Sequence, residues 1–259
     1  METITDWNGV PMLVGRSKGG VIAAAEPLRN LMRVDLAPWP PAEVVQKLYE
    51  SRQSRAFAPP DLDCVTSTLG FYSDLQSLHS EDALTWSCFG PLIYGDSNCR
   101  KEFVEALFAR LAIPSGPVAD ARLWLWRRIP HPDTRVPGGP EVDVGIQTET
   151  CLLFGEAKWL SGVGARQGVA RDKDQIQLRR EFFEKYGQRL YPSVRHFGVL
   201  GLSHLGDMIP TSLTRQLGGS GGALYMCDLR WEELVSLPHP RRDELKRYLE
   251  WKRSRSRLT

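Results

Sequence analysis

The stretch Pro140–Trp159, PEVDVGIQTETCLLFGEAKW, decides the fold because it places charged residues inside two predicted strands. Apolar residues alternate with other residues from 142 to 147, the period of a strand, and Asp143 lies among them. The second apolar run leads directly into Glu156 and Lys158. Acidic residues are depleted in strands, and lysine is rarely buried without a partner. The three charges therefore need a compensating interaction.

Side-chain alternation decides whether these charges can meet. Asp143 and Glu156 share one face of a hairpin if an even number of residues forms the turn. A four-residue turn over residues 147–150 or over residues 148–151 satisfies this condition. Glu156 and Lys158 are two residues apart and share a face in either case. The pattern predicts two carboxylates and one ammonium on one surface, where a divalent cation would offset the carboxylate charges.

This arrangement resembles the PD-(D/E)XK, or restriction-endonuclease-like, nuclease superfamily, whose signature is an acidic residue followed after a gap by (D/E)-X-K. Here the residues are Asp143 and Glu156-Ala157-Lys158, and Val142 stands where the signature has proline, with Pro140 nearby. The resemblance covers about residues 80–204. It implies an α/β fold with a restriction-endonuclease-like core: a central mixed sheet of four to five strands flanked by helices, in the order α-β-β-β-α-β. A surface hairpin with solvated charges is the alternative, which the apolar second run disfavours.

The resemblance also implies a chemistry. Asp143, Glu156 and the Ala157 carbonyl would bind Mg²⁺ or Mn²⁺, which take oxygen ligands. Lys158 would position a water molecule or stabilise charge on the phosphate. Without the metal, repulsion between the carboxylates should raise the pKa of at least one. The expected function is metal-dependent hydrolysis of nucleic acid, with DNA as the expected substrate, and many such nucleases are homodimers.

Three further residues are candidates for completing the site. Glu81 follows the predicted N-cap Ser80, and in the resembled superfamily a helix at this place often offers an acid to the metal; support of the helix N-terminus is the alternative. Gln175 and Gln177 lie on a polar helix after the motif, where related nucleases often place a residue that orients the site. A solvated helix face is the alternative for both glutamines.

Basic residues near the motif are candidates for nucleic-acid binding. A glycine-rich segment follows Lys158 and holds Arg166 and Arg171, with Lys173 just after it. A surface loop without a ligand is the alternative. Trp124 and Trp126 in a predicted strand fit sheet packing better than base stacking. The basic C-terminal run fits a solvated tail, or a further source of attraction for DNA.

Composition places broader limits. The chain has 259 residues and a formal net charge of +2, which excludes a strongly basic, histone-like binder. Five scattered cysteines do not form a zinc or disulfide pattern. No run of eighteen apolar residues and no basic-then-apolar leader is present, so we expect a cytoplasmic protein without membrane contact. None of the five histidines stands in a recognised nucleophile signature. The main alternative to a nuclease is an inactive nucleic-acid-binding or scaffold module with the same fold.

The predicted organisation is an N-terminal extension over residues 1–60, a nuclease core over 61–230 and a C-terminal basic helix over 231–259. The helix that begins after Ser80 is predicted to kink or end at Pro91. Further predicted helices cover residues 41–49, 97–112, 172–186 and 240–258, predicted strands cover 122–129, 196–203 and 223–229, and residues 217–222 are predicted to form a loop.

Overall fold

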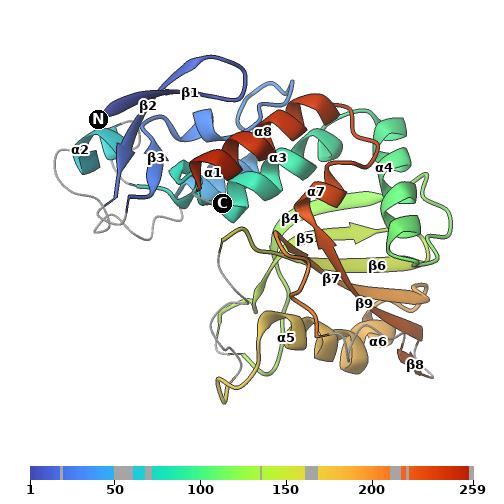
Figure 1. Cartoon of the computed structure of the whole chain (residues 1–259). Coiled ribbons are helices and arrows are strands. Elements are labelled where there is room, and N and C mark those ends of the chain that lie inside the picture. The colour runs from blue at the N-terminus through green and yellow to red at the C-terminus, as the bar shows by residue number, and fades with distance from the viewer. Residues whose placement is uncertain are drawn as a thin grey trace. The chain divides into compact units, whose positions relative to one another are not determined.

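The computed structural model describes residues 1–17, 20–49, 61–67, 72–134, 136–160, 169–210, 217–219 and 222–256. The chain divides into two compact units (Figure 1). The first unit is Met1–Gly95 with Arg241–Thr259, and the second unit is Asp96–Pro240. Each unit is described by itself, because their positions relative to one another are not determined. This division differs from the predicted bounds 1–60, 61–230 and 231–259.

The first unit contains a small antiparallel sheet whose surroundings are held together by buried amides. The Nε2 of Gln76 donates to the carbonyl of Ala24, 3.0 Å away, and to that of Val65. The Nδ2 of Asn30 donates to the carbonyls of Leu75 and Ser77 at 2.7 and 2.8 Å. A buried polar group is costly unless it is hydrogen-bonded, so each amide fixes the backbone segments that it bridges.

Helix α8 belongs to the first unit and is not a solvated tail. Trp251 donates its indole N–H to the Thr5 carbonyl at 2.8 Å, and Tyr248 donates its hydroxyl to the Asn30 carbonyl at 2.9 Å. The ring of Trp7 meets Tyr248 edge-on, with centroids 4.7 Å apart. The many basic residues of this helix led to the prediction of a solvated tail. Its buried aromatic side chains instead attach the C-terminal segment to the N-terminal segment.

Helix α3 (Glu81–Ile93) continues for two residues past Pro91 instead of ending there. Ser80 caps its N-terminus as predicted, accepting from the Ala83 N–H at 3.1 Å. Pro91 lies in the last turn, where the missing N–H removes one helical hydrogen bond. Most of the helix is buried, so tertiary packing outweighs that loss. The described elements of the first unit are β1 (Glu2–Thr5), β2 (Pro11–Arg16), β3 (Ile22–Ala24), 3-10 turns at Pro27–Asn30 and Asp74–Gln76, α1 (Ala42–Tyr49), α2 (Asp61–Ser67), α3 (Glu81–Ile93) and α8 (Arg242–Arg255).

The second unit is built on a six-stranded mixed sheet, in the order β4-β5-β6-β7-β9-β8. Strands β4, β5 and β6 are antiparallel neighbours, whereas β6, β7 and β9 run parallel. The predicted strand 196–203 is confirmed, parallel to β6. The elements are α4 (Ser97–Arg110), β4 (Arg122–Arg128), β5 (Glu141–Gln147), β6 (Cys151–Ala157), α5 (Gln175–Phe182), a π-helical turn (Phe183–Gly187), α6 (Gln188–Leu190), β7 (His196–Ser203), β8 (Leu217–Gly219), β9 (Gly222–Arg230) and α7 (Trp231–Leu234).

Helices cover both faces of this sheet. On one face Phe183 packs against Phe154 and Phe197, with ring centroids 4.5 and 5.1 Å apart. On the other face a Cβ at Gly198 would lie 3.3 Å from Ile113, just beyond α4. Phe197 and Gly198 are consecutive in β7, so these contacts are on opposite faces. The observed α/β architecture, a mixed sheet flanked by helices, agrees with the predicted fold class.

Three predicted details were wrong. The sheet has more than five strands, because β8 pairs with β9 where the glycines of residues 217–222 predicted only a loop. Helix α5 begins at Gln175 rather than residue 172, because Asp174 caps it through the Gln177 N–H. The helical path does not end at Gly187, since a π turn carries it on into α6. Among the described residues, no helix is long and apolar enough to cross a membrane.

Lys252 of α8 gives a stability prediction for the first unit. Burial lowers its pKa to about 7, and its ammonium donates to the Ser80 carbonyl at 3.2 Å. The pKa of an unfolded lysine is about 10.5, so the unfolded chain binds the additional proton between these two pH values. We expect the free energy of unfolding to rise from pH 7 to pH 10 by up to about 1 kcal/mol per pH unit.

The substitution Lys252→Met should remove this rise and increase stability at pH 7. Urea denaturation at both pH values measures the effect. The matched control is Lys246→Met, at an exposed position of the same helix, which should keep the wild-type pH dependence. A Lys252→Met protein with the wild-type slope would contradict the prediction.

Candidate functional site

The hairpin of β5 and β6 has the register that the charge pattern predicts. Val144 pairs with Gly155 and Gln147 pairs with Leu152. The Thr148 N–H donates to the Cys151 carbonyl at 2.9 Å, which closes the second of the two turns considered from the sequence. Continued by one pair, this register sets Asp143 opposite Glu156, although the observed ladder stops at Val144 and Gly155.

The two strands part immediately beyond Val144 and Gly155. Their pairing ends there, although β5 continues beside β4 and β6 continues beside β7. The next available N–H of β6, that of Ala157, donates to the Oδ2 of Asp143 at 2.7 Å. A side-chain carboxylate thus takes the position of a backbone acceptor, and a gap opens between two central strands.

Lys158 lies at the β6 side of this gap. Its Nζ donates to Glu156 Oε1 at 3.0 Å and to the Ala157 carbonyl at 2.7 Å. Trp231, which is fully buried, donates its indole N–H to the Lys158 carbonyl at 2.9 Å. These bonds fix the backbone and ammonium of Lys158. The Ala157 carbonyl, a predicted metal ligand, already accepts a hydrogen bond from this lysine.

A fourth charged side chain, Arg179 of α5, also reaches the gap. Its Nη2 donates to the carbonyl of Glu141 and lies 3.5 Å from Glu156 Oε2. The side chain is 2% exposed, and its Nε has no hydrogen-bond partner among the described residues. The sequence held a signal for this position, because Ile176, Arg179 and Phe183 recur at helical spacing on the apolar side of α5. We define Asp143, Glu156, Lys158 and Arg179 as the charged cluster.

Burial dominates the electrostatics of the charged cluster. Glu156 is 1% exposed, and loss of solvation together with the nearby Asp143 carboxylate raises the pKa of Glu156 to about 8. Lys158 and Arg179 oppose this shift by favouring the charged carboxylate. The expected increase of one carboxyl pKa is therefore confirmed. The cluster balances two carboxyl groups against two cationic side chains within a few ångströms.

The predicted supporting residues lie elsewhere or have other roles. Gln177 forms a capping box with Asp174: its Oε1 accepts from the Asp174 N–H at 2.9 Å, and its N–H donates to Asp174 Oδ1 at 2.8 Å. Gln175 begins α5, and the residue of this helix that contacts Glu156 is Arg179. Glu81 begins α3 in the first unit, so its participation stays a prediction.

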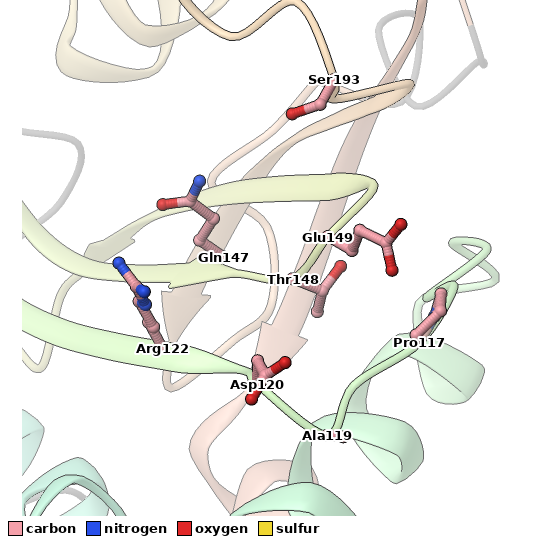
Figure 2. Close-up of a pocket in the computed structure, with 8 residues that line it drawn as sticks. All are labelled: Pro117, Ala119, Asp120, Arg122, Gln147, Thr148, Glu149 and Ser193. Carbon is pink, nitrogen blue, oxygen red and sulfur yellow. The ribbon is translucent and has the colours of Figure 1, made fainter.

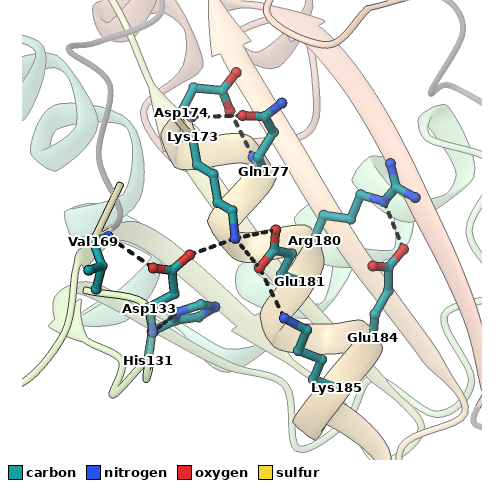
Figure 3. A network of polar contacts seen from close by, with 10 residues as sticks. All are labelled: His131, Asp133, Val169, Lys173, Asp174, Gln177, Arg180, Glu181, Glu184 and Lys185. Atoms are coloured by element: carbon teal, nitrogen blue, oxygen red, sulfur yellow. Dashed lines mark hydrogen bonds and ion pairs between the residues drawn. The ribbon is translucent and has the colours of Figure 1, made fainter. Parts of the chain in front are cut away.

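The three basic residues that were predicted to contact nucleic acid differ in what the structure shows of them. Lys173 is engaged by two carboxylates, those of Asp133 at 2.5 Å and Glu181 at 2.8 Å (Figure 3). These bonds raise the pKa of Lys173 and fix the ammonium within the protein. Arg171 is exposed and has a φ of 54°. Arg166 lies outside the described residues. Of the two that the structure describes, Lys173 is the one whose charge is already paired.

Two adjoining hollows lie beside strand β4 rather than at the charged cluster. The smaller, of about 390 Å³, adjoins the turn end of the hairpin, where Arg122 and Gln147 lie on neighbouring strands (Figure 2). Its acidic residues, Asp120 and Glu149, are exposed. Exposed carboxylates interact weakly in water, so this hollow lacks the buried charge typical of a catalytic centre.

Comparison of the chain with protein-family models, with curated proteins and with solved structures gave no match. The likeness to the PD-(D/E)XK superfamily thus stays a prediction, carried by the motif and the register of its hairpin.

The raised pKa of Glu156 predicts how metal-free stability depends on pH. The folded state holds a proton on Glu156 up to about pH 8, whereas an unfolded glutamate loses it near pH 4.5. The stabilisation from this proton is complete below pH 4.5 and is lost as the pH rises through 8. We expect the free energy of unfolding, measured in EDTA, to decrease from pH 5 to pH 8. Glu156→Gln should flatten this decrease, and a variant that retains the full wild-type decrease would contradict the assignment.

Proposed function

We propose that the second unit is a metal-dependent nuclease that hydrolyses phosphodiester bonds, with DNA as the first substrate to test. The observation that carries the proposal is the charged cluster in the gap between β5 and β6. The Asp143 carboxylate accepts from the Ala157 N–H at 2.7 Å, beside Glu156, and the Lys158 ammonium is 3.0 Å from Glu156. Carboxylate oxygens are the donors that Mg²⁺ and Mn²⁺ prefer, so the donor set fits a hard divalent cation.

Each side chain has a defined role in this proposal. Asp143 and Glu156 would hold the cation, which when bound would neutralise a phosphate and lower the pKa of a water molecule. Lys158 would place its ammonium against negative charge that develops on the phosphate. Asp143 is oriented for this role by the Ala157 N–H, and Lys158 by its bonds to Glu156 and the Ala157 carbonyl. Such preorganised charges act without reorganisation during the reaction.

A specific observation favours an alternative, an inactive nucleic-acid-binding or scaffold module of the same fold. Glu156 already contacts two cationic groups, those of Lys158 and Arg179. A carboxylate neutralised in this way holds a cation less strongly, because binding must first displace or share the existing partners. The two functions differ in whether the cluster binds metal and whether a phosphodiester is cleaved.

Cleavage assays with plasmid, linear and single-stranded DNA in Mg²⁺ or Mn²⁺ test the proposal. Asp143→Asn and Lys158→Ala should each reduce cleavage by at least about 100-fold, the size of loss typical for an electrostatic catalytic group. Lys185→Ala is the matched control. The exposed ammonium of Lys185, in the turn after α5, also pairs with a glutamate, since it lies 3.3 Å from Glu181 of α5. Circular dichroism checks that all three variants fold.

Calorimetry with Mn²⁺ separates the two functions. Wild-type binding that Asp143→Asn abolishes, together with cleavage, supports the nuclease. DNA binding without metal binding or cleavage supports the inactive module. Wild-type cleavage by both Asp143→Asn and Lys158→Ala excludes the assigned residues.

A further inference from the structure

The two hollows beside β4 form one continuous groove along the edge of the sheet. They share Ala119, Asp120, Arg122 and Gln147, and the larger hollow has a volume of about 750 Å³. Among the strands that the structure describes, β4 is the first of the sheet and has no neighbour on its outer side. We call this feature the β4 groove. Its basic lining residues are Arg100, Arg122 and Arg127, and its acidic ones are Asp120, which lines both hollows, and Glu149, which lines the smaller one.

Two of the three arginines of strand β4, Arg122 and Arg127, are suited to an external anion. Arg122 and Arg127 are exposed, and among the described residues neither makes an ion pair. They are five residues apart, which is roughly 17 Å along a strand. This distance is larger than the width of one small anion. It corresponds to about five nucleotides of a duplex strand, at a rise of about 3.4 Å for each nucleotide.

A break in strand alternation brings Arg127 to the face of the charged cluster. Trp126 has a φ of 54°, which is rare for a residue with a large side chain. Trp124 and Arg127 would point to opposite faces of a regular strand, yet the Arg127 guanidinium carbon is 5.2 Å from the centroid of the Trp124 ring. Trp124 lies over Gly145, which pairs with Phe154, and Phe154 shares its face of β6 with Glu156. The positive φ thus places a guanidinium on that face.

The surroundings of Trp124 also decide what the groove recognises. A Cβ at Gly145 would lie 2.1 Å from Trp124 Cε2, so the indole rests directly on the backbone of β5. Arg127 occupies a position over the same indole. The indole thus contacts both the backbone of β5 and the guanidinium of Arg127. It orients that guanidinium and is not available for a base to stack on. Recognition in the groove therefore depends on phosphate charge rather than base identity.

We propose that the β4 groove binds the sugar-phosphate backbone of a nucleic-acid strand and leads it to the charged cluster. Arg127 pairs across the sheet with Val142, the residue next to Asp143, so this part of the groove lies nearest the cluster. Arg122, which lines both hollows, contacts the strand where they meet. This inference rests on the proposed function for the direction of the strand, and the binding itself can be measured without cleavage.

Fluorescence anisotropy of labelled single-stranded and duplex DNA, in EDTA to prevent hydrolysis, tests the inference. The double variant Arg122→Ala/Arg127→Ala should bind at least about tenfold more weakly, with equal effect on unrelated sequences. The slope of log affinity against log salt should decrease by about 2, because two phosphate contacts are lost. The double lysine variant should retain most of the affinity, since lysine also binds phosphate as a point charge.

Arg189→Ala is the matched control. This exposed arginine of α6 also lies over an aromatic ring, 5.3 Å from the centroid of Tyr186, and should leave affinity and salt slope unchanged. Thermal unfolding of each variant verifies the fold.

The outcomes test the binding role of the groove separately from the proposed nuclease activity. If the double alanine variant keeps the wild-type affinity and salt slope, the inference about the groove is wrong, even where Asp143→Asn abolishes cleavage and the nuclease proposal is supported. If that variant loses its affinity for DNA, the inference about the groove is supported, even where Asp143→Asn and Lys158→Ala cleave normally and the nuclease assignment fails. A wild-type protein that binds neither oligonucleotide overturns the groove outright.

Discussion

The hydrogen bond from the Ala157 N–H to Asp143 is the constraint on which the site depends. An interior strand cannot leave its backbone N–H groups without acceptors, since each buried orphan costs about 1–3 kcal/mol. Where β5 and β6 part, the Asp143 carboxylate supplies the acceptor at 2.7 Å. The sheet can therefore open at its centre without losing that bond. Glu156, Lys158 and Arg179 occupy the region that this opening creates.

The charge balance of the opening follows from its burial. An isolated charge in such a place would be prohibitively unstable, and removal of one partner from a buried pair typically costs 3–5 kcal/mol. Glu156 contacts Lys158 on one side and Arg179 on the other, which gives each cation a partner. Any cation that binds at Asp143 and Glu156 must then compete with these groups. Arg179 is thus as important to the chemistry of the cluster as the residues of the motif itself.

The sequence predicted the face and the register of the hairpin because both follow from alternation. Asp143, Glu156 and Lys158 were brought together by parity alone, and a turn closed over residues 148–151 satisfied it. The alternation of side chains does not determine where the pairing of β5 with β6 ends, so the gap could not be predicted. Arg179 was visible on the apolar side of α5, but the strand that it would meet depends on tertiary packing.

Local chemistry misled the prediction in the helices and termini for a similar reason. Pro91 was expected to interrupt α3, yet burial of that helix offsets one missing hydrogen bond. The basic end of the chain predicted a tail, whereas Tyr248 and Trp251 bind it to the first unit. In both cases long-range burial outweighed a local preference, and a single sequence does not reveal which distant surface will be available.

Two irregularities of the central sheet lie in one row across neighbouring strands. The residues on either side of Trp126, Leu125 and Arg127, pair with Val144 and Val142, so Trp126 lies opposite Asp143. Asp143 is where β5 leaves β6, and Trp126 is where β4 loses its alternation. A side chain held in a sparsely populated backbone region costs about 1–3 kcal/mol and persists only where its surroundings determine it. This one row thus holds the Asp143 carboxylate at the end of the β5–β6 ladder and the irregular residue that precedes Arg127 of the β4 groove, so the two proposed sites meet at one row of the sheet.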